Sequence, residues 1–148
     1  MKLQSGNIFS VICLLTSGFC FSSCEEFKPI YSEVPVIEFV SVSSTSVNAA
    51  DPLTFRISYT DGDGDLGENT DGVSNLFLSD SRFGTYYSYR VKQLSPNTSI
   101  IIKGTIVIEL TSAKLTGPSP QSTVFSIYVV DRAGHASNTV ISPTVTVY

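Results

Sequence analysis

Acidic side chains at alternating positions mark the segment from Asp61 to Gly72, DGDGDLGENTDG. Two carboxylates about 6 Å apart repel each other by roughly 0.7 kcal/mol in water and by about 3 kcal/mol at an effective dielectric of 20. The segment therefore needs either a bound cation or room for its side chains to spread. It holds five of the thirteen acidic residues of the chain, namely Asp61, Asp63, Asp65, Glu68 and Asp71.

The spacing of these acids suits a hard cation. Gly62 and Gly64 separate the first three carboxylates and permit tight curvature, so that alternate side chains can turn towards a common centre. Ca²⁺ accepts six to eight oxygen atoms at 2.3–2.6 Å. We therefore predict a calcium site. Its first ligands are expected to be Asp61, Asp63 and Asp65, and the remaining ones Glu68, Asn69, Asp71 or backbone carbonyl groups.

A turn that binds no ion is the alternative for the same segment, because Asp, Gly and Asn dominate turns for local conformational reasons. The segment also differs from an EF-hand loop, which has Gly at its sixth position and Glu at its twelfth. This chain has Leu66 and Gly72 there, so that only the D-x-D-x-D core is shared. The sequence alone leaves the metal site and the solvated turn open.

A second polar loop, Asp131 to Asn138 (DRAGHASN), is expected at the same end of the molecule. Asp131 could join the acidic segment as a ligand, or Arg132 could neutralise it. A turn built around Gly134 without any ligand is the simpler interpretation. His135 is the only histidine, and no Cys follows residue 24, which argues against a zinc site.

The remaining sequence predicts strands to position these loops. With 42% hydrophobic and 15% charged residues, the chain has the composition of an ordinary globular domain. Short runs rich in Val, Ile, Thr, Tyr and Phe alternate between apolar and polar residues, and no window shows helical spacing. We expect an all-β fold over residues 34–148, a single immunoglobulin-like antiparallel β-sandwich of about seven strands. The expected strands are 36–42, 53–59, 75–78, 86–92, 100–110, 124–130 and 139–147.

Two residues should interrupt this regular pattern. Pro143 cannot donate to a sheet ladder, so the final strand is expected to be an edge strand or to be broken in two. Gly104 is expected to mark a bend or bulge in the strand over residues 100–110. The chain has no Trp and no internal Cys pair, so the relation to antibody domains is one of architecture only.

Residues 1–23 have the features of a secretory signal peptide. A short basic start precedes an apolar run from Ile8 to Phe21, which is too short and too polar to span a bilayer that needs about 20 apolar residues. The string FSSC ending at Cys24 resembles the bacterial lipobox, in which a Cys is lipidated and becomes the mature N-terminus. We therefore expect Cys24 to carry a lipid anchor and residues 24–33 to form a tether.

Glu25 and Glu26 directly follow that cysteine. They resemble the acidic export tag of lipoproteins of Bacteroidota, which places a lipoprotein on the outside of the outer membrane. The resemblance implies an outer-membrane lipoprotein that faces the cell surface. An anchor that faces the periplasm is the alternative.

Three longer stretches carry a further resemblance: RISYTDGDGDLG (Arg56 to Gly67), YSYRVKQLSP (Tyr87 to Pro96) and FSIYVVDRAGHASN (Phe125 to Asn138). They are similar to a recurring family of uncharacterised Bacteroidota lipoproteins with a single immunoglobulin-like domain and a DGDGDLG loop. The likeness covers nearly all of the mature chain. It implies the fold and the lipid anchor, and it implies no ligand or activity.

Composition and motifs narrow the function to a non-catalytic class. A pI near 4.8 with scattered Lys and Arg argues against nucleic-acid binding. None of the common catalytic motifs occurs, so we expect no enzyme. We expect a membrane-anchored extracytoplasmic binding module for a glycan or protein partner. A structural accessory subunit of an outer-membrane complex is the alternative. The candidate aromatic residues for contact with such a partner are Tyr86, Tyr87 and Tyr89, for which packing at the rim of the sheet is the simpler interpretation.

Overall fold

The computed structural model describes residues 31–84, 86–96 and 99–148, and every regular element in this part of the chain is a β-strand. The all-β prediction is confirmed. The strands are β1 (Val36–Val42), β2 (Ser46–Val47), β3 (Leu53–Asp61), β4 (Leu76–Asp80), β5 (Tyr86–Tyr89), β6 (Ile102–Leu110), β7 (Gln121–Thr123), β8 (Phe125–Val129), β9 (Val140–Ile141) and β10 (Val145–Val147).

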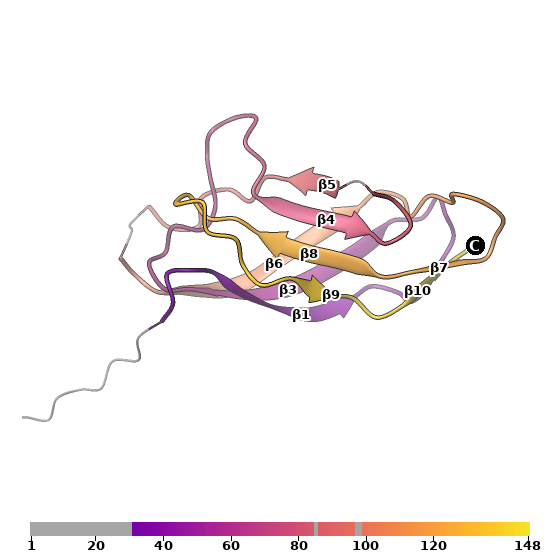
Figure 1. Ribbon diagram of the computed structural model, residues 1–148, viewed down its shortest axis with the longest axis horizontal. Coiled ribbons are helices and arrows are strands. Elements are labelled where there is room, and N and C mark those ends of the chain that lie inside the picture. Colours follow the sequence, from indigo (N-terminus) through magenta and orange to yellow (C-terminus); the bar gives the residue numbers. More distant parts are fainter. Residues whose placement is uncertain (1–30, 85, 97–98) are drawn as a thin grey trace, which may run out of the picture.

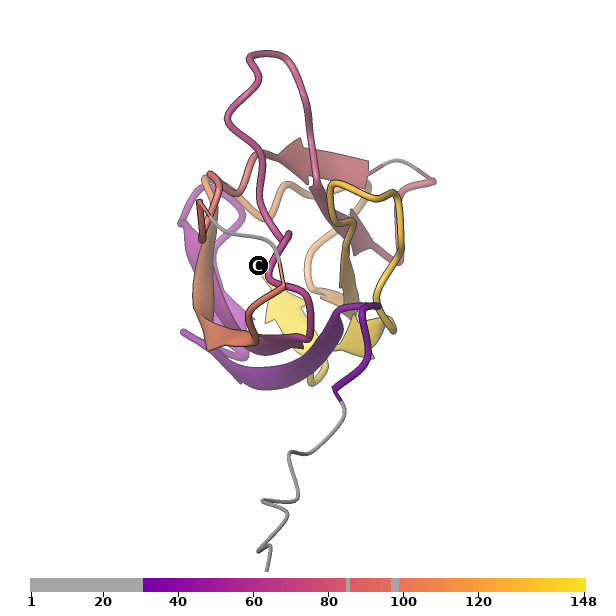
Figure 2. The same cartoon turned by 90° about the vertical axis from the view of Figure 1, so that its left-hand side faces the viewer.

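Two sheets pack face to face and form the predicted β-sandwich (Figures 1 and 2). One sheet has the order β1-β3-β6 and the other the order β5-β4-β8-β9, with antiparallel pairing throughout both. A small third sheet has the order β2-β10-β7, so the last strand, β10, pairs with β2 on one side and with β7 on the other. Within it, β2 and β10 run parallel.

The core is formed by the inward-facing side chains of strands whose residues alternate between the two faces of a sheet. Phe55 and Ile57 of β3 and Phe125 and Ile127 of β8 are completely buried. The rings of Phe55 and Phe125 meet across the two sheets with their centroids 4.9 Å apart. Each such side chain contributes about 1.5–3 kcal/mol through its burial. The period-two pattern of the sequence therefore shows which face of each strand packs inward.

Pro143 divides the last strand, as its missing N–H predicts. β9 pairs with β8, whereas β10 beyond the proline pairs with β7 and β2. Ser142 fills the gap in the ladder: its N–H donates to Phe125 O at 2.8 Å, and its hydroxyl accepts from Phe125 N at 3.0 Å. The break thus lets one segment serve two sheets.

The prediction of a bulge at Gly104 is wrong. β3 and β6 pair without a register shift over nine residues, and Gly104 lies opposite Tyr59 in that ladder. The Tyr59 ring covers the glycine so closely that a Cβ at position 104 would lie only 2.7 Å from the phenol oxygen. The irregularity of this sheet lies in β1 instead, between Phe39 and Ser41.

The two polar loops and the start of the described chain lie at the same end of the sandwich, opposite the C-terminus (Figure 1). Asn138 ties this end together. Its side-chain oxygen accepts from Ile37 N at 2.9 Å, and its amide donates to Ile37 O at 2.8 Å. The fold therefore brings the loop after β3 and the loop after β8 together, as predicted.

Candidate metal site

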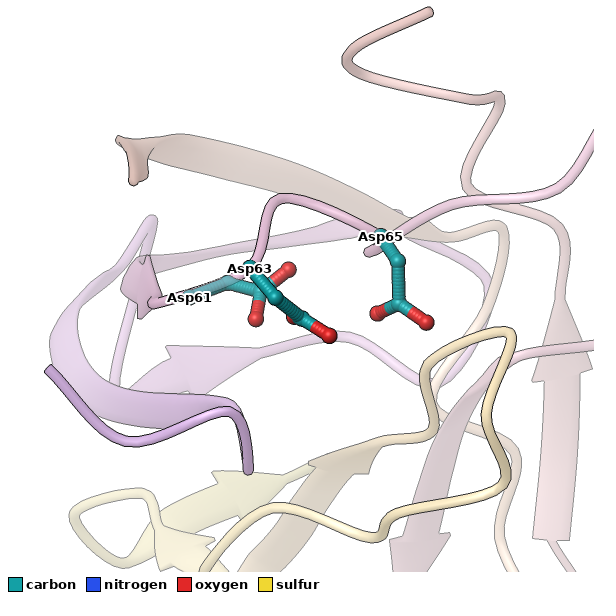
Figure 3. Close-up of side chains that lie close together, drawn as sticks. All are labelled: Asp61, Asp63 and Asp65. Atoms are coloured by element: carbon teal, nitrogen blue, oxygen red, sulfur yellow. The ribbon is translucent and has the colours of Figure 1, made fainter. Parts of the chain in front are cut away.

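Three carboxylates gather where β3 ends. Asp61 is the last residue of β3, and Asp63 and Asp65 follow in the loop, so that the three side chains turn towards one region (Figure 3). One carboxylate oxygen from each lies within 4.8 Å of the other two. Two oxygen atoms on opposite sides of a Ca²⁺ ion are about 5 Å apart. The cluster could therefore hold a single metal ion.

The free oxygen atoms of this cluster are buried. Asp61 is 0% exposed and Asp65 is 6% exposed, whereas Asp63 is half-buried. The Oδ1 atoms of all three are shielded from solvent and have no hydrogen-bond partner. A buried polar atom without a partner costs about 1–3 kcal/mol, and more if it is charged. The arrangement leaves unpaired negative charge directed at a common centre.

Leu66 holds this loop in shape. Its side chain is completely buried in the core, directly after the third aspartate. Its N–H donates to Asp61 Oδ2 at 2.8 Å, which closes the loop on itself. Gly67 continues with a φ of 92° and passes so close to Lys92 O that a Cβ would lie 2.3 Å from it. The acidic loop, Asp61 to Asp65, is therefore anchored by the two residues that directly follow it.

Burial raises the pKa of Asp61 to about 6. The Leu66 N–H opposes this rise. The neighbouring Asp63 carboxyl and the negative charge of Asp65 add to it. Burial also raises the pKa of Asp65, together with repulsion from Asp131 and Asp63. Proton uptake by these carboxyl groups thus partly relieves the charge repulsion that a bound cation would remove.

The loop after β8 braces the acidic loop. Ala133 N donates to Asp65 Oδ2 at 3.0 Å, so that only Oδ1 of this carboxylate is left unpaired. The Arg132 guanidinium donates to Gly67 O at 2.8 Å, and its charge opposes part of the rise in the pKa of Asp65. Arg132 therefore offsets only part of the negative potential at Asp65, and its guanidinium bonds to a backbone carbonyl just after the acidic loop.

Asp131 lies outside the cluster of three. Its side chain is fully buried and accepts from His135 N at 2.7 Å, while Oδ2 lies 3.1 Å from His135 Nδ1. These contacts close the turn around Gly134, which has a φ of 91°. Asp131 acts as a turn residue that adds negative potential at Asp65, and not as one of the grouped ligands.

Glu68 and Asp71 also lie outside the cluster, although the sequence predicts them as members of the same ligand set. Glu68 accepts from the N–H of Thr70 at 2.8 Å and from its hydroxyl at 2.9 Å, which lowers the pKa of Glu68. The Asp71 side chain is 96% exposed and pairs with Arg90. The reason is the Leu66 anchor, beyond which the chain turns away into the long loop that precedes β4.

The predicted tyrosine cluster divides between the two faces of its sheet. Tyr86 is 58% exposed, whereas Tyr87 and Tyr89 pack against the core. The outward-facing aromatic group is instead Phe77, Tyr86 and Tyr128. Phe77 and Tyr128 stack with centroids 4.9 Å apart, and Tyr86 meets Tyr128 edge-on at 5.9 Å. Cross-strand register, which the sequence does not display, selects these three residues.

No family model, curated protein or solved structure matches this chain. In the described part of the chain, there is no helix with the length and hydropathy to span a bilayer. The predicted signal peptide, Cys24 and most of the tether lie outside the described residues.

Proposed function

We propose that the protein is an exported, lipid-anchored binding module whose loop end is stabilised by one Ca²⁺ ion. The observation that carries the calcium site is the set of unpaired, buried Oδ1 atoms of Asp61, Asp63 and Asp65. Ion binding would convert their mutual repulsion into attraction towards one centre. The account thus gives a physical reason for three carboxylates at the end of a core strand.

Calcium fits this donor set better than other common ions. All three side chains offer hard oxygen atoms, and the chain's one imidazole, that of His135, is engaged with Asp131. Zn²⁺ favours nitrogen and sulfur ligands, and Mg²⁺ demands near-ideal octahedral geometry. Water that enters past the half-buried Asp63 would fill the rest of a calcium shell.

Thermal unfolding tests the calcium site. A Ca²⁺ concentration a hundredfold above Kd stabilises a protein by about 2.7 kcal/mol, which corresponds to a rise in Tm of roughly 10 °C here. The double variant Asp63→Asn, Asp65→Asn should lose this rise. A native protein whose Tm does not respond to Ca²⁺ would contradict the site.

The anchor is proposed from the sequence. Cys24 would carry the acyl chains that hold the protein on the outer membrane, since two or more chains give stable attachment. Labelled palmitate should enter the native protein and not the Cys24→Ala variant. Equal labelling of the two would remove the anchor from the account.

The side of the membrane is a separate question. We propose that the module faces the cell surface, because Glu25 and Glu26 follow the anchor cysteine. Protease added to intact cells should then release the domain. Protection in intact cells, followed by cleavage after the outer membrane is opened, would place it in the periplasm.

For the partner, the aromatic group Phe77, Tyr86 and Tyr128 favours a glycan. The outward positions of β4, β5, β8 and β9 carry no charged side chain, and rings next to hydroxyls suit a neutral polyhydroxylated ligand. These positions are Phe77, Ser79, Tyr86, Ser88, Ser126, Tyr128 and Ile141.

Screening against soluble polysaccharides tests this proposal. Tyr86→Ala and Tyr128→Ala should abolish binding, while Tyr148→Ala, which removes an exposed tyrosine elsewhere, should not. Retention of binding in both test variants would move the glycan site elsewhere. Failure of every polysaccharide, together with co-purification of a stable membrane complex, would favour the structural accessory subunit.

A further inference from the structure

The stem of the domain, residues 31–33, lies against the acidic loop. Gly62 N donates to Ser32 O at 2.9 Å, which joins the stem to the residue between two of the clustered aspartates. A Cβ on Gly62 would lie 2.3 Å from Ser32 O and 2.8 Å from Tyr31 O, so only glycine allows this approach. The backbone that positions Asp61 and Asp63 is therefore also the backbone that holds the stem.

A second contact fixes the stem on β6. Lys103 Nζ donates to the Tyr31 hydroxyl at 3.0 Å and lies 4.3 Å from the centre of its ring. Segment 99–103 is in turn connected to the acidic loop, because Ser99 N donates to Asp63 O. Lys103 is itself fixed in the β3–β6 ladder opposite Thr60, so the Gly62–Ser32 bond is the attachment point that depends on the conformation of the loop from Asp61 to Asp65.

We propose that cation binding at Asp61, Asp63 and Asp65 locks the stem against the sandwich. This inference rests on the metal site of the proposed function. Asp61 is completely buried and its Oδ1 is unpaired, so the ion would act on a fixed residue on one side of Gly62. On the other side, it would draw in the half-buried Asp63 and hold the Gly62 N–H in place for Ser32 O.

The lock would set the distance and the orientation of the sandwich relative to the membrane. Residues 25–30 separate the expected anchor, Cys24, from the stem, and the seven steps from residue 24 to residue 31 reach at most about 25 Å. With the stem docked, the sandwich is held close to the membrane in a restricted orientation. With the stem released, the domain gains reach and rotational freedom.

Limited proteolysis of the full chain in detergent measures the state of the stem. Chymotrypsin cleavage at the Tyr31–Ser32 bond, followed by mass spectrometry, should be slower with Ca²⁺ than with EDTA, on the order of tenfold, because cleavage tracks the open population. In Asp63→Asn, cleavage should be fast in both conditions. Equal cleavage of the native protein in both conditions, with a Tm that still rises in Ca²⁺, overturns the lock and leaves the metal site intact.

Gly62→Ala separates the lock from the ion site. It keeps all three carboxylates and removes the space for Ser32, so Ca²⁺ should still raise Tm while the stem is cleaved rapidly. Gly84→Ala is the matched control, because a Cβ added at this position has no atom within 4 Å. The stem of this variant should be protected from cleavage as well as that of the native protein. Lys103→Met, which frees Tyr31, provides a second test, and full protection in this variant and in Gly62→Ala would overturn the lock. Loss of the Tm response in the native protein would instead defeat the metal site itself.

Discussion

The Oδ2 atom of Asp61 accepts a hydrogen bond of 2.8 Å from the backbone N–H of Leu66, and both residues are completely buried. This bond closes the acidic loop onto the last residue of β3. It satisfies one oxygen of the carboxylate and leaves the other without a partner, in a side chain that lies beside Asp63 and Asp65 (Figure 3). The relationship separates this loop from a solvated turn, whose carboxylates would be exposed to water.

Truncation of the anchor should weaken both the fold and the site. Leu66→Ala should lower the free energy of unfolding by about 2–5 kcal/mol, since it leaves a cavity in the core. It should also weaken Ca²⁺ binding, because the N–H that orients Asp61 is no longer held in place. Chemical denaturation measures the first effect and calcium titration the second. Leu94→Ala, at a position that is 40% exposed, is the matched control, and an equal loss there would contradict the anchoring role.

Asp63→Asn should have opposite effects with and without calcium. Without the ion, the substitution removes a repelling charge and should stabilise the protein by about 1 kcal/mol. With saturating Ca²⁺, it removes a ligand and should leave the variant less stable than the native protein. Denaturation curves in EDTA and in Ca²⁺ give both values. The same sign in both conditions would identify Asp63 as a structural residue only.

The calcium-free protein should become more stable on mild acidification. Its folded state holds the pKa of Asp61 at about 6, above the ordinary value of 3.8, so folding takes up a proton between these two values. The free energy of unfolding in EDTA should therefore fall by on the order of 2 kcal/mol as pH rises from about 4.5 to 7.5. Asp61→Asn should remove most of this dependence. A native protein whose stability in EDTA rises over that interval would contradict the crowded cluster.

Arg82 should be important for stability at the other end of the sandwich. Asp80 is 1% exposed. Burial alone would raise the pKa of Asp80, but hydrogen bonds from Arg82 and Thr123 hold it below its ordinary value. Arg82→Ala leaves this charge buried and unpaired, and should cost about 3–5 kcal/mol of unfolding free energy.

The exposed pair of Arg90 and Asp71 provides the control for that experiment. Arg90→Ala should cost less than about 1 kcal/mol, because the Asp71 side chain is 96% exposed. The pairing of Asp80 with Arg82 should stabilise the folded protein at pH values above the unfolded pKa of Asp80. This stabilisation should be lost as pH falls through the lower pKa that Asp80 has in the folded state. Equal costs for the two arginine variants at pH 7 would contradict the assignment.

The strands follow from the sequence because burial on one face imposes a period of two, which is legible in residues such as Phe55, Ile57 and Phe125. The break at Pro143 follows from its missing donor. The role of Gly104 does not follow from the sequence, because it depends on the Tyr59 ring across the ladder, which no local pattern reveals.

The site was predictable only in part. Alternating aspartates at the end of a core strand predicted the cluster. The burial of Leu66 in the core and hydrogen bonds within the two loops decided the rest. Leu66 turns Glu68 and Asp71 away, and Asp131 closes its own turn with His135. A single apolar residue within a polar segment was the only signal for the Leu66 anchor.

Calorimetric titration of the full chain with Ca²⁺ tests the central claim most directly. The account predicts one ion bound per chain in the native protein, and no binding in the Asp63→Asn, Asp65→Asn variant. The absence of binding to the native protein, or unchanged binding to the variant, would contradict it.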